Sequence, residues 1–197
     1  MFGKAEMPRL MALAFASSLF VVHDATTSAQ SGAAFDLART SVTSVHAYVA
    51  SEAIPRHVAA PANIVTSNEF RLLIETMLRQ SPTFRRQCLR IGSEPRLTIR
   101  LAMAAPPERS DFRASTRLER EPDGRLSAEI RISVPGAIVE LIAHELEHVI
   151  EQLDGVDLAA RAAQHDSGVK ALSSAPTAFE TIRARRAGQK VASETTR

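Results

Sequence analysis

Two histidines and a glutamate at positions 144–148 have the spacing of a metal site. His144, Glu145 and His148 form the pattern His-Glu-x-x-His. On a helix, side chains four residues apart lie one turn apart on the same face. Two imidazoles placed in this way can bind one Zn²⁺ at about 2.0–2.1 Å. The glutamate between them lies beside the metal, where it can accept a proton from water. The sequence therefore predicts His144 and His148 as metal ligands and Glu145 as the catalytic base.

The segment around this pattern has the period and the boundaries of a helix. A Pro-Gly pair marks its start and Gly155 follows it, so we expect a helix over 136–153. Its apolar positions share one face: Ile138, Ile142, Val149 and Leu153. The two histidines lie about 40° apart on the opposite side and are expected to face away from the core. Glu147 and Glu151 lie near them, either as hydrogen-bond partners of the imidazoles or as a solvated rim.

The motif and its surroundings resemble those of the zincin metallopeptidases. The resemblance covers residues 133–155, with a strand hairpin before them and a helix after them. It implies an α+β fold in which a small sheet packs against the motif helix. It also implies a third protein ligand, whose identity distinguishes the subfamilies.

Glu180 is the preferred third ligand. Pro176 indicates the first turn of a second helix over 176–190, and this helix would carry the glutamate. The layout is similar to that of the gluzincins, in which a glutamate on a following helix completes the site. The resemblance therefore implies zinc held by His144, His148 and Glu180.

Other residues after the motif remain open as third ligands. They are Asp154, Asp157, His165 and Asp166. Asp154 stands six residues after the second histidine, but Glu151 occupies the position where that arrangement needs a glycine. An ordinary first-turn glutamate, favoured by the helix dipole, is the competing interpretation of Glu180.

Alternating apolar and polar residues predict a sheet upstream of the motif. Strands are expected over 97–103, 112–119 and 126–134, and the Glu-Pro-Asp-Gly turn at 121–124 joins the last two as a hairpin. We expect an antiparallel sheet of at least three strands with one buried face. Helical spacing predicts two helices, over 67–78 and 82–92, and weaker patterns suggest short strands at 46–49 and 63–66.

The first 29 residues have the features of an export signal. Lys4 and Arg9 precede a short apolar run over 10–22, and Thr27-Ser28-Ala29 supplies small residues for cleavage after Ala29. The run is too short to span a bilayer comfortably. We therefore expect a signal peptide over 1–29, one domain over 30–197, a secreted or periplasmic location, and no stable membrane anchor after cleavage.

Composition excludes several classes of protein. The chain has 197 residues, of which 24 are Lys or Arg and 22 are Asp or Glu, and its net charge is +2. This balance and the absence of Trp argue against nucleic acid as a partner. The single cysteine, Cys88, cannot support an intramolecular disulfide framework and is expected to be a small core residue.

These features together predict a secreted or periplasmic zinc-dependent peptidase. It would hydrolyse peptide bonds in a peptide or protein by means of metal-activated water, and an exposed sheet edge could align the substrate by strand addition. Two alternatives remain. One is a zincin-fold protein that binds metal without proteolysis, and the other is a secreted interaction domain without metal.

Overall fold

The computed structural model describes residues 19–23, 57–104, 112–133, 136–172 and 175–196. Helices and strands follow one another along the chain as an α+β fold. In chain order they are β1 (Leu19–His23), β2 (Ile64–Thr66), α1 (Asn68–Gln80), α2 (Pro82–Gly92), β3 (Leu97–Met103), β4 (Ala114–Arg120), β5 (Leu126–Ile132), α3 (Ile138–Leu153), α4 (Leu158–Ala162), β6 (Val169–Leu172), β7 (Ala175–Thr181) and α5 (Ile182–Thr195).

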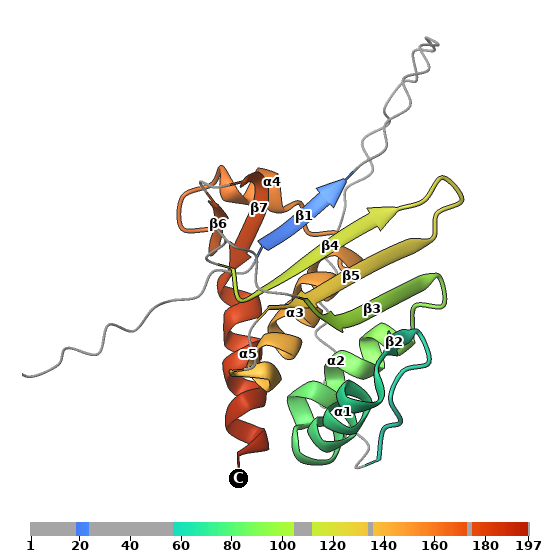
Figure 1. Cartoon of the computed structure of the whole chain (residues 1–197). Coiled ribbons are helices and arrows are strands. Elements are labelled where there is room, and N and C mark those ends of the chain that lie inside the picture. The colour runs from blue at the N-terminus through green and yellow to red at the C-terminus, as the bar shows by residue number, and fades with distance from the viewer. Residues whose placement is uncertain (1–18, 24–56, 105–111, 134–135, 173–174, 197) are drawn as a thin grey trace, which may run out of the picture.

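The strands form a mixed sheet extended by a small antiparallel pair. Their order is β2-β3-β5-β4-β1-β7-β6 (Figure 1). β3 is parallel to both β2 and β5, β4 is antiparallel to β5, and β1 is parallel to β4. A pairing of Val21 with Ala178 connects β1 to the antiparallel β6–β7 pair.

The predicted strands are present, but the fully antiparallel sheet is wrong. The expected hairpin does form between β4 and β5, and Gly124 in its turn has a φ of 81°. β3, however, pairs with β5 in parallel. Alternation identifies which face of a strand is buried but not which strand lies beside it. Here β5 lies between β3 and β4 in the sheet.

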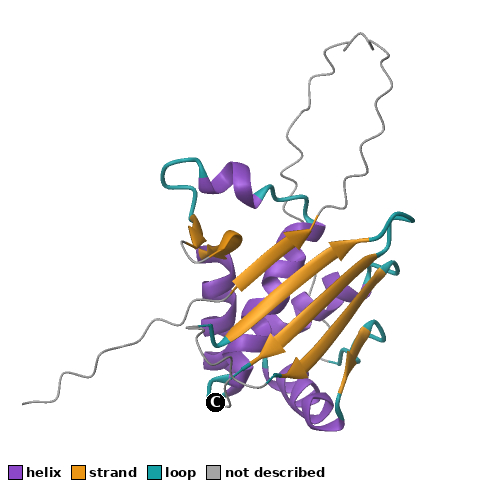
Figure 2. Cartoon of the chain, turned by 45° about the horizontal axis from the view of Figure 1, so that its top comes forward, coloured by secondary structure: helices purple, strands orange, loops and turns teal. Residues whose placement is uncertain are grey.

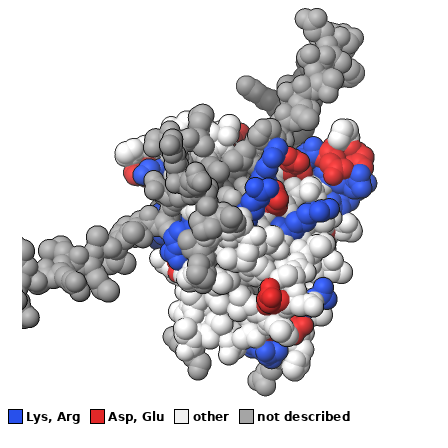
Figure 3. All heavy atoms as spheres, viewed as in Figure 1, with Lys and Arg blue, Asp and Glu red and all other residues white. Residues whose placement is uncertain are grey.

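In the part of the chain that the structure describes, helices cover one face of the mixed sheet. Figure 2 shows most of the helices behind the strands. The buried residues that face them alternate along three strands: Leu97, Ile99, Leu101, Ala114, Thr116, Leu118, Leu126, Ala128, Ile130 and Ile132. The other face carries ion pairs such as Arg117–Glu119 and Arg131–Glu129. Figure 3 shows basic and acidic side chains next to one another on this side.

The two helices expected before the sheet are confirmed. Ser81 separates them, and its hydroxyl accepts a hydrogen bond from the backbone N–H of Phe84 at 2.9 Å, which caps α2. Glu194 of α5 accepts hydrogen bonds from the hydroxyls of Ser81, at 2.6 Å, and Thr83, at 3.0 Å. The end of α5 is thereby connected to the start of α2. Of the two weaker strand predictions, 63–66 corresponds to β2, whereas 46–49 lies outside the described residues.

The helix predicted over 176–190 begins later than expected. Residues 175–181 form β7, in which Glu180 pairs with Lys170 of β6, and α5 begins at Ile182. The reason is an N-cap, because the Thr181 hydroxyl accepts a hydrogen bond from the N–H of Ala184 at 2.9 Å. Glu180 therefore lies on a strand, one residue before the cap, and not on the helix.

Part of the predicted signal peptide is a strand in this structure. Leu19–His23, at the end of the apolar run, forms β1 between β4 and β7. The expected cleavage position after Ala29 lies outside the described residues. In the part of the chain that the structure describes, each helix is too short or too polar to cross a membrane.

The motif helix is buried on both sides, and this corrects the expected orientation of its histidines. Residues 141–151 are all buried, because α5 packs on the side of α3 that lies away from the sheet. Gly188 makes this packing possible. A Cβ at this position would lie only 2.7 Å from the backbone oxygen of Glu140 and 3.1 Å from the Cβ of His144. A backbone oxygen cannot move aside, so the close approach depends on glycine.

We therefore expect Gly188→Ala to force α5 away from α3. Overpacking of this kind lowers the free energy of unfolding by about 1–3 kcal/mol, although alanine favours the helix. Chemical denaturation of the two proteins measures the difference. Gly136→Ala is the matched control, because a Cβ at Gly136 would meet nothing within 4 Å. Equal stabilities of the two variants would contradict this account of the α3–α5 contact.

Candidate metal centre

Three side chains from two elements meet at the motif helix. His144 and His148 extend from α3, and Glu180 extends from β7; their ligand atoms all lie within 4.8 Å of one another. The Nε2 atoms of the two histidines are 3.1 Å apart, and His144 Nε2 is 3.6 Å from Glu180 Oε2. Ligands bound tetrahedrally to zinc at 2.0–2.1 Å lie about 3.3 Å from one another. The separations of 3.1 and 3.6 Å are close to this value, so the three side chains could hold one metal ion.

Glu145 lies on the other side of the motif, toward the sheet. Its carboxylate accepts a hydrogen bond of 2.7 Å from the hydroxyl of Thr116 on β4, and both residues are fully buried. Its negative charge is close enough to raise the pKa of His148. A strand of the sheet thus holds the proposed base in place beside the histidines.

A hydrogen-bonded chain orients the second histidine. Glu151 accepts a hydrogen bond from His148 Nδ1 at 3.0 Å and another from the hydroxyl of Thr181 at 2.8 Å. A carboxylate on Nδ1 directs Nε2 toward a metal and makes it a stronger ligand. Thr181 also caps α5, so through Glu151 the same residue connects His148 to the start of that helix.

The two histidines have opposite shifts in pKa. Burial, followed by the nearby His148 and Arg185, lowers the pKa of His144 to about 3. Burial is also the largest influence on His148 and acts to lower its pKa. The hydrogen bond to Glu151 and the negative charges of the nearby carboxylates together outweigh burial, so the pKa of His148 is raised. His144 is therefore neutral near pH 7, the form that binds a metal. The raised pKa of His148 means that protons compete more strongly with a metal for this imidazole.

The remaining candidates for the third ligand have other partners. Asp154 forms ion pairs with Arg90, at 3.3 Å, and Arg183, at 2.9 Å. Asp157 accepts a hydrogen bond from the N–H of Ala160 at 2.8 Å and caps α4. His165 and Asp166 have side chains that are 97% and 88% exposed, and they contact each other. Only Glu180, among the five residues weighed, lies with His144 and His148.

Glu147 and Glu151, which also lie on the motif helix, have different roles. Glu151 is hydrogen-bonded to His148, as expected if it is a partner of an imidazole. Glu147 accepts hydrogen bonds from Gln87 Nε2 at 2.7 Å and Arg183 Nε at 2.7 Å, so it connects α3 to α2 and α5. Neither residue is a solvated rim, since Glu147 is 8% exposed and Glu151 is 3% exposed.

Sequence analysis missed Thr116 and Thr181 as residues of the site. Thr116 could have been noticed, because it is the one hydroxyl between Ala114 and Leu118 on the predicted buried face of its strand. A polar side chain on such a face needs a partner. The sequence around Thr181 gave no comparable signal, because the role of Thr181 depends on where α5 begins. Cys88, in contrast, is the small core residue expected, and burial raises the pKa of its thiol to about 12.

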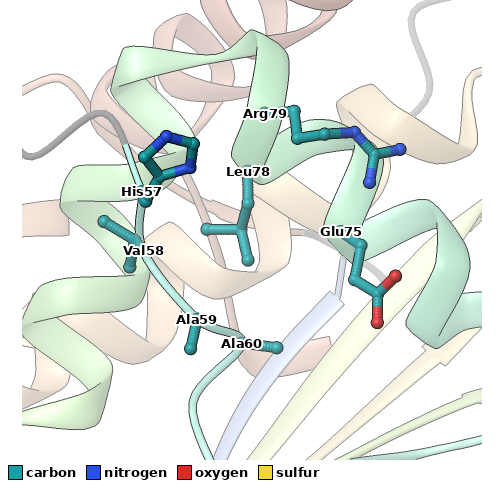
Figure 4. A pocket seen from close by; sticks show the side chains of 7 residues that line it. All are labelled: His57, Val58, Ala59, Ala60, Glu75, Leu78 and Arg79. Carbon is teal, nitrogen blue, oxygen red and sulfur yellow. The ribbon is translucent and has the colours of Figure 1, made fainter.

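A pocket of about 390 Å³ opens beside Glu180. Arg185, Lys170 and Ile182 contribute to its walls, and an Arg185 nitrogen lies 3.9 Å from Glu180 Oε1. Figure 4 shows a separate pocket of about 590 Å³, lined by His57, Val58, Ala59, Ala60, Glu75, Leu78 and Arg79. The second pocket includes none of the residues of the metal centre.

Comparisons with known proteins give no relative. No family model matches the chain, and neither a curated protein nor a solved structure matches it.

We expect Glu151→Gln to weaken metal binding through His148. An amide cannot hold the imidazole as a carboxylate does, and loss of such a partner lowers metal affinity by about 10- to 100-fold. Competition with a zinc-binding dye measures the affinity. Glu147→Gln is the matched control: it lies one turn earlier on the same helix and contacts Gln87 and Arg183 in place of a histidine. If both variants bind zinc equally well, the role given to Glu151 is wrong.

Proposed function

We propose that this chain is a zinc-dependent peptidase of the zincin type, with a gluzincin-like ligand set. The observation that carries the proposal is the convergence of His144, His148 and Glu180. Two imidazoles and one carboxylate are a donor set of catalytic zinc sites, which leave a fourth position open. Glu145, held by Thr116 beside this set, supports an active centre more than a structural one.

The residues fit the chemistry of peptide hydrolysis. Zinc held by these side chains would polarise a carbonyl group and lower the pKa of water. Glu145 would accept the proton from the attacking water and deliver it to the leaving amine. Glu151 and Thr181 would keep His148 in the orientation for binding. The proposed substrate is a peptide or protein, and nucleic acid is not proposed as a partner.

The proposed location is outside the cytoplasm, either secreted or periplasmic. Its support is the apolar run followed by Thr27-Ser28-Ala29, with cleavage after Ala29 and a mature domain over 30–197. We propose that the mature domain has no stable membrane anchor after this cleavage.

A zincin-fold protein that binds metal without proteolysis is the second candidate. The observation that favours it is burial, because His144 is 7% exposed, Glu180 is 5% exposed and Glu145 is fully buried. A substrate must reach the metal, and this degree of burial restricts its access to the three side chains.

Glu145 and Glu180 are expected to fail differently when they are replaced. Glu145→Gln keeps the size of the side chain but removes the base, so zinc should remain while hydrolysis falls by roughly 10²–10⁴-fold. Glu180→Ala removes a ligand, so both zinc and hydrolysis should be lost. The measurements are metal content and cleavage of a peptide library by protein recovered after export.

Replacement of three residues away from the cluster provides the controls. Asp154→Ala, Asp157→Ala and His165→Ala should retain zinc and activity, since other contacts or solvent surround these side chains. Full zinc in Glu180→Ala, together with loss in one of the three controls, would reject Glu180 as the ligand. Zinc binding without any hydrolysis by the wild-type protein would favour the second candidate.

A further inference from the structure

A strand from the predicted signal peptide lies between the two strands that flank the metal centre. β1 pairs with β4 from Leu19 opposite Ser115 to His23 opposite Glu119, and with β7 through Val21 opposite Ala178. Figure 1 shows it, in blue, between these neighbours. Among the described strands, it alone pairs with both.

Both neighbours of β1 contribute directly to the site. β4 carries Thr116, whose hydroxyl holds Glu145, and Phe20 of β1 is the residue paired with Thr116. β7 carries Glu180, two residues beyond the pairing of Ala178 with Val21. An extended backbone in this position therefore runs past the base on one side and past the carboxylate ligand on the other.

Removal of β1 would leave two strand edges facing each other across a groove. Cleavage after Ala29 would take Leu19–His23 away with the signal peptide. The backbone N–H and C=O groups of β4 and β7 that β1 satisfies would then need new partners. Free edges of this kind bind extended peptides by strand addition, using backbone groups of any sequence.

We propose that the groove between β4 and β7 binds the substrate as an extended peptide, and that Leu19–His23 occupies this groove in the unprocessed chain. The substrate would lie parallel to β4 and antiparallel to β7, in the direction of β1. Cleavage of the bound peptide rests on the proposed function, whereas its binding in the groove does not.

The first test opens the groove in the full-length chain. Phe20→Pro with Val21→Pro removes adjacent N–H groups, which in a strand point toward opposite neighbours, so neither edge can keep β1. Phe20→Tyr with Val21→Ile is the matched control that keeps both N–H groups and the preference for strand. All proteins carry Glu145→Gln to prevent cleavage. The probe is a fluorescent peptide with the sequence of residues 17–25, and its anisotropy measures binding.

The opened chain should bind the peptide at least about tenfold more tightly than the control, because the groove of the control is occupied. A probe peptide with proline at the positions of Phe20 and Val21 should not bind either chain. If the opened chain keeps its zinc content and circular dichroism but binds no better than the control, the proposal is overturned. With Glu145 restored, binding without cleavage would support the groove and reject the peptidase function, so the two failures are distinguishable.

A reversible lock tests the same proposal if the proline variant does not fold. Val21→Cys with Ala178→Cys places cysteines at an antiparallel pair, whose Cα atoms are about 4.5–5.5 Å apart and within reach of a disulfide. Cys88 is buried and does not interfere. The oxidised chain should exclude the peptide at every concentration, whereas the reduced chain, in which β1 can leave the groove, should bind it as weakly as the control of the first test. Equal binding in the two states would overturn the proposal.

Discussion

Burial of four carboxylates around two histidines is the constraint on which the rest of the structure depends. Glu145, Glu147, Glu151 and Glu180 are all buried on or beside α3. Buried charge is costly unless it is paired, hydrogen-bonded or bound to a metal. Arg183 offsets Glu147, and His148 with Thr181 offsets Glu151. Glu145 and Glu180 direct their charge toward the histidines, where a divalent cation would stabilise both.

The fold provides this arrangement through two close contacts. Gly188 lets α5 approach the backbone of α3, and the Thr181 cap fixes where β7 ends and α5 begins. Glu180 therefore lies next to the histidines at the end of β7, one residue before the N-cap of α5. On the opposite side, the buried stripe of the sheet contains a single hydroxyl beside Glu145, that of Thr116. Two helices and one sheet thus position the two histidines, Glu145 and Glu180, which come from different parts of the chain.

Local patterns in the sequence predicted the elements well and their pairing poorly. Alternation identified β3, β4 and β5, and the turn at 121–124 identified a hairpin, because both signals act over a few neighbouring residues. The parallel pairing of β3 with β5 depends on contacts distant in sequence. Pro176 was interpreted as a helix start, but the helix cap formed at Thr181. The spacing of His144 and His148 was readable because one helical turn sets it, whereas Thr181 and Gly188 gained meaning only from tertiary packing.

The most direct measurement of the central claim is X-ray absorption at the zinc edge of the wild-type chain, combined with its metal content. The account predicts one zinc per chain, with two imidazole ligands and the remaining ligands oxygen, all at about 2.0–2.1 Å. A chain that retains no zinc after exposure to an equimolar amount, or whose zinc lacks two imidazole ligands, would contradict it.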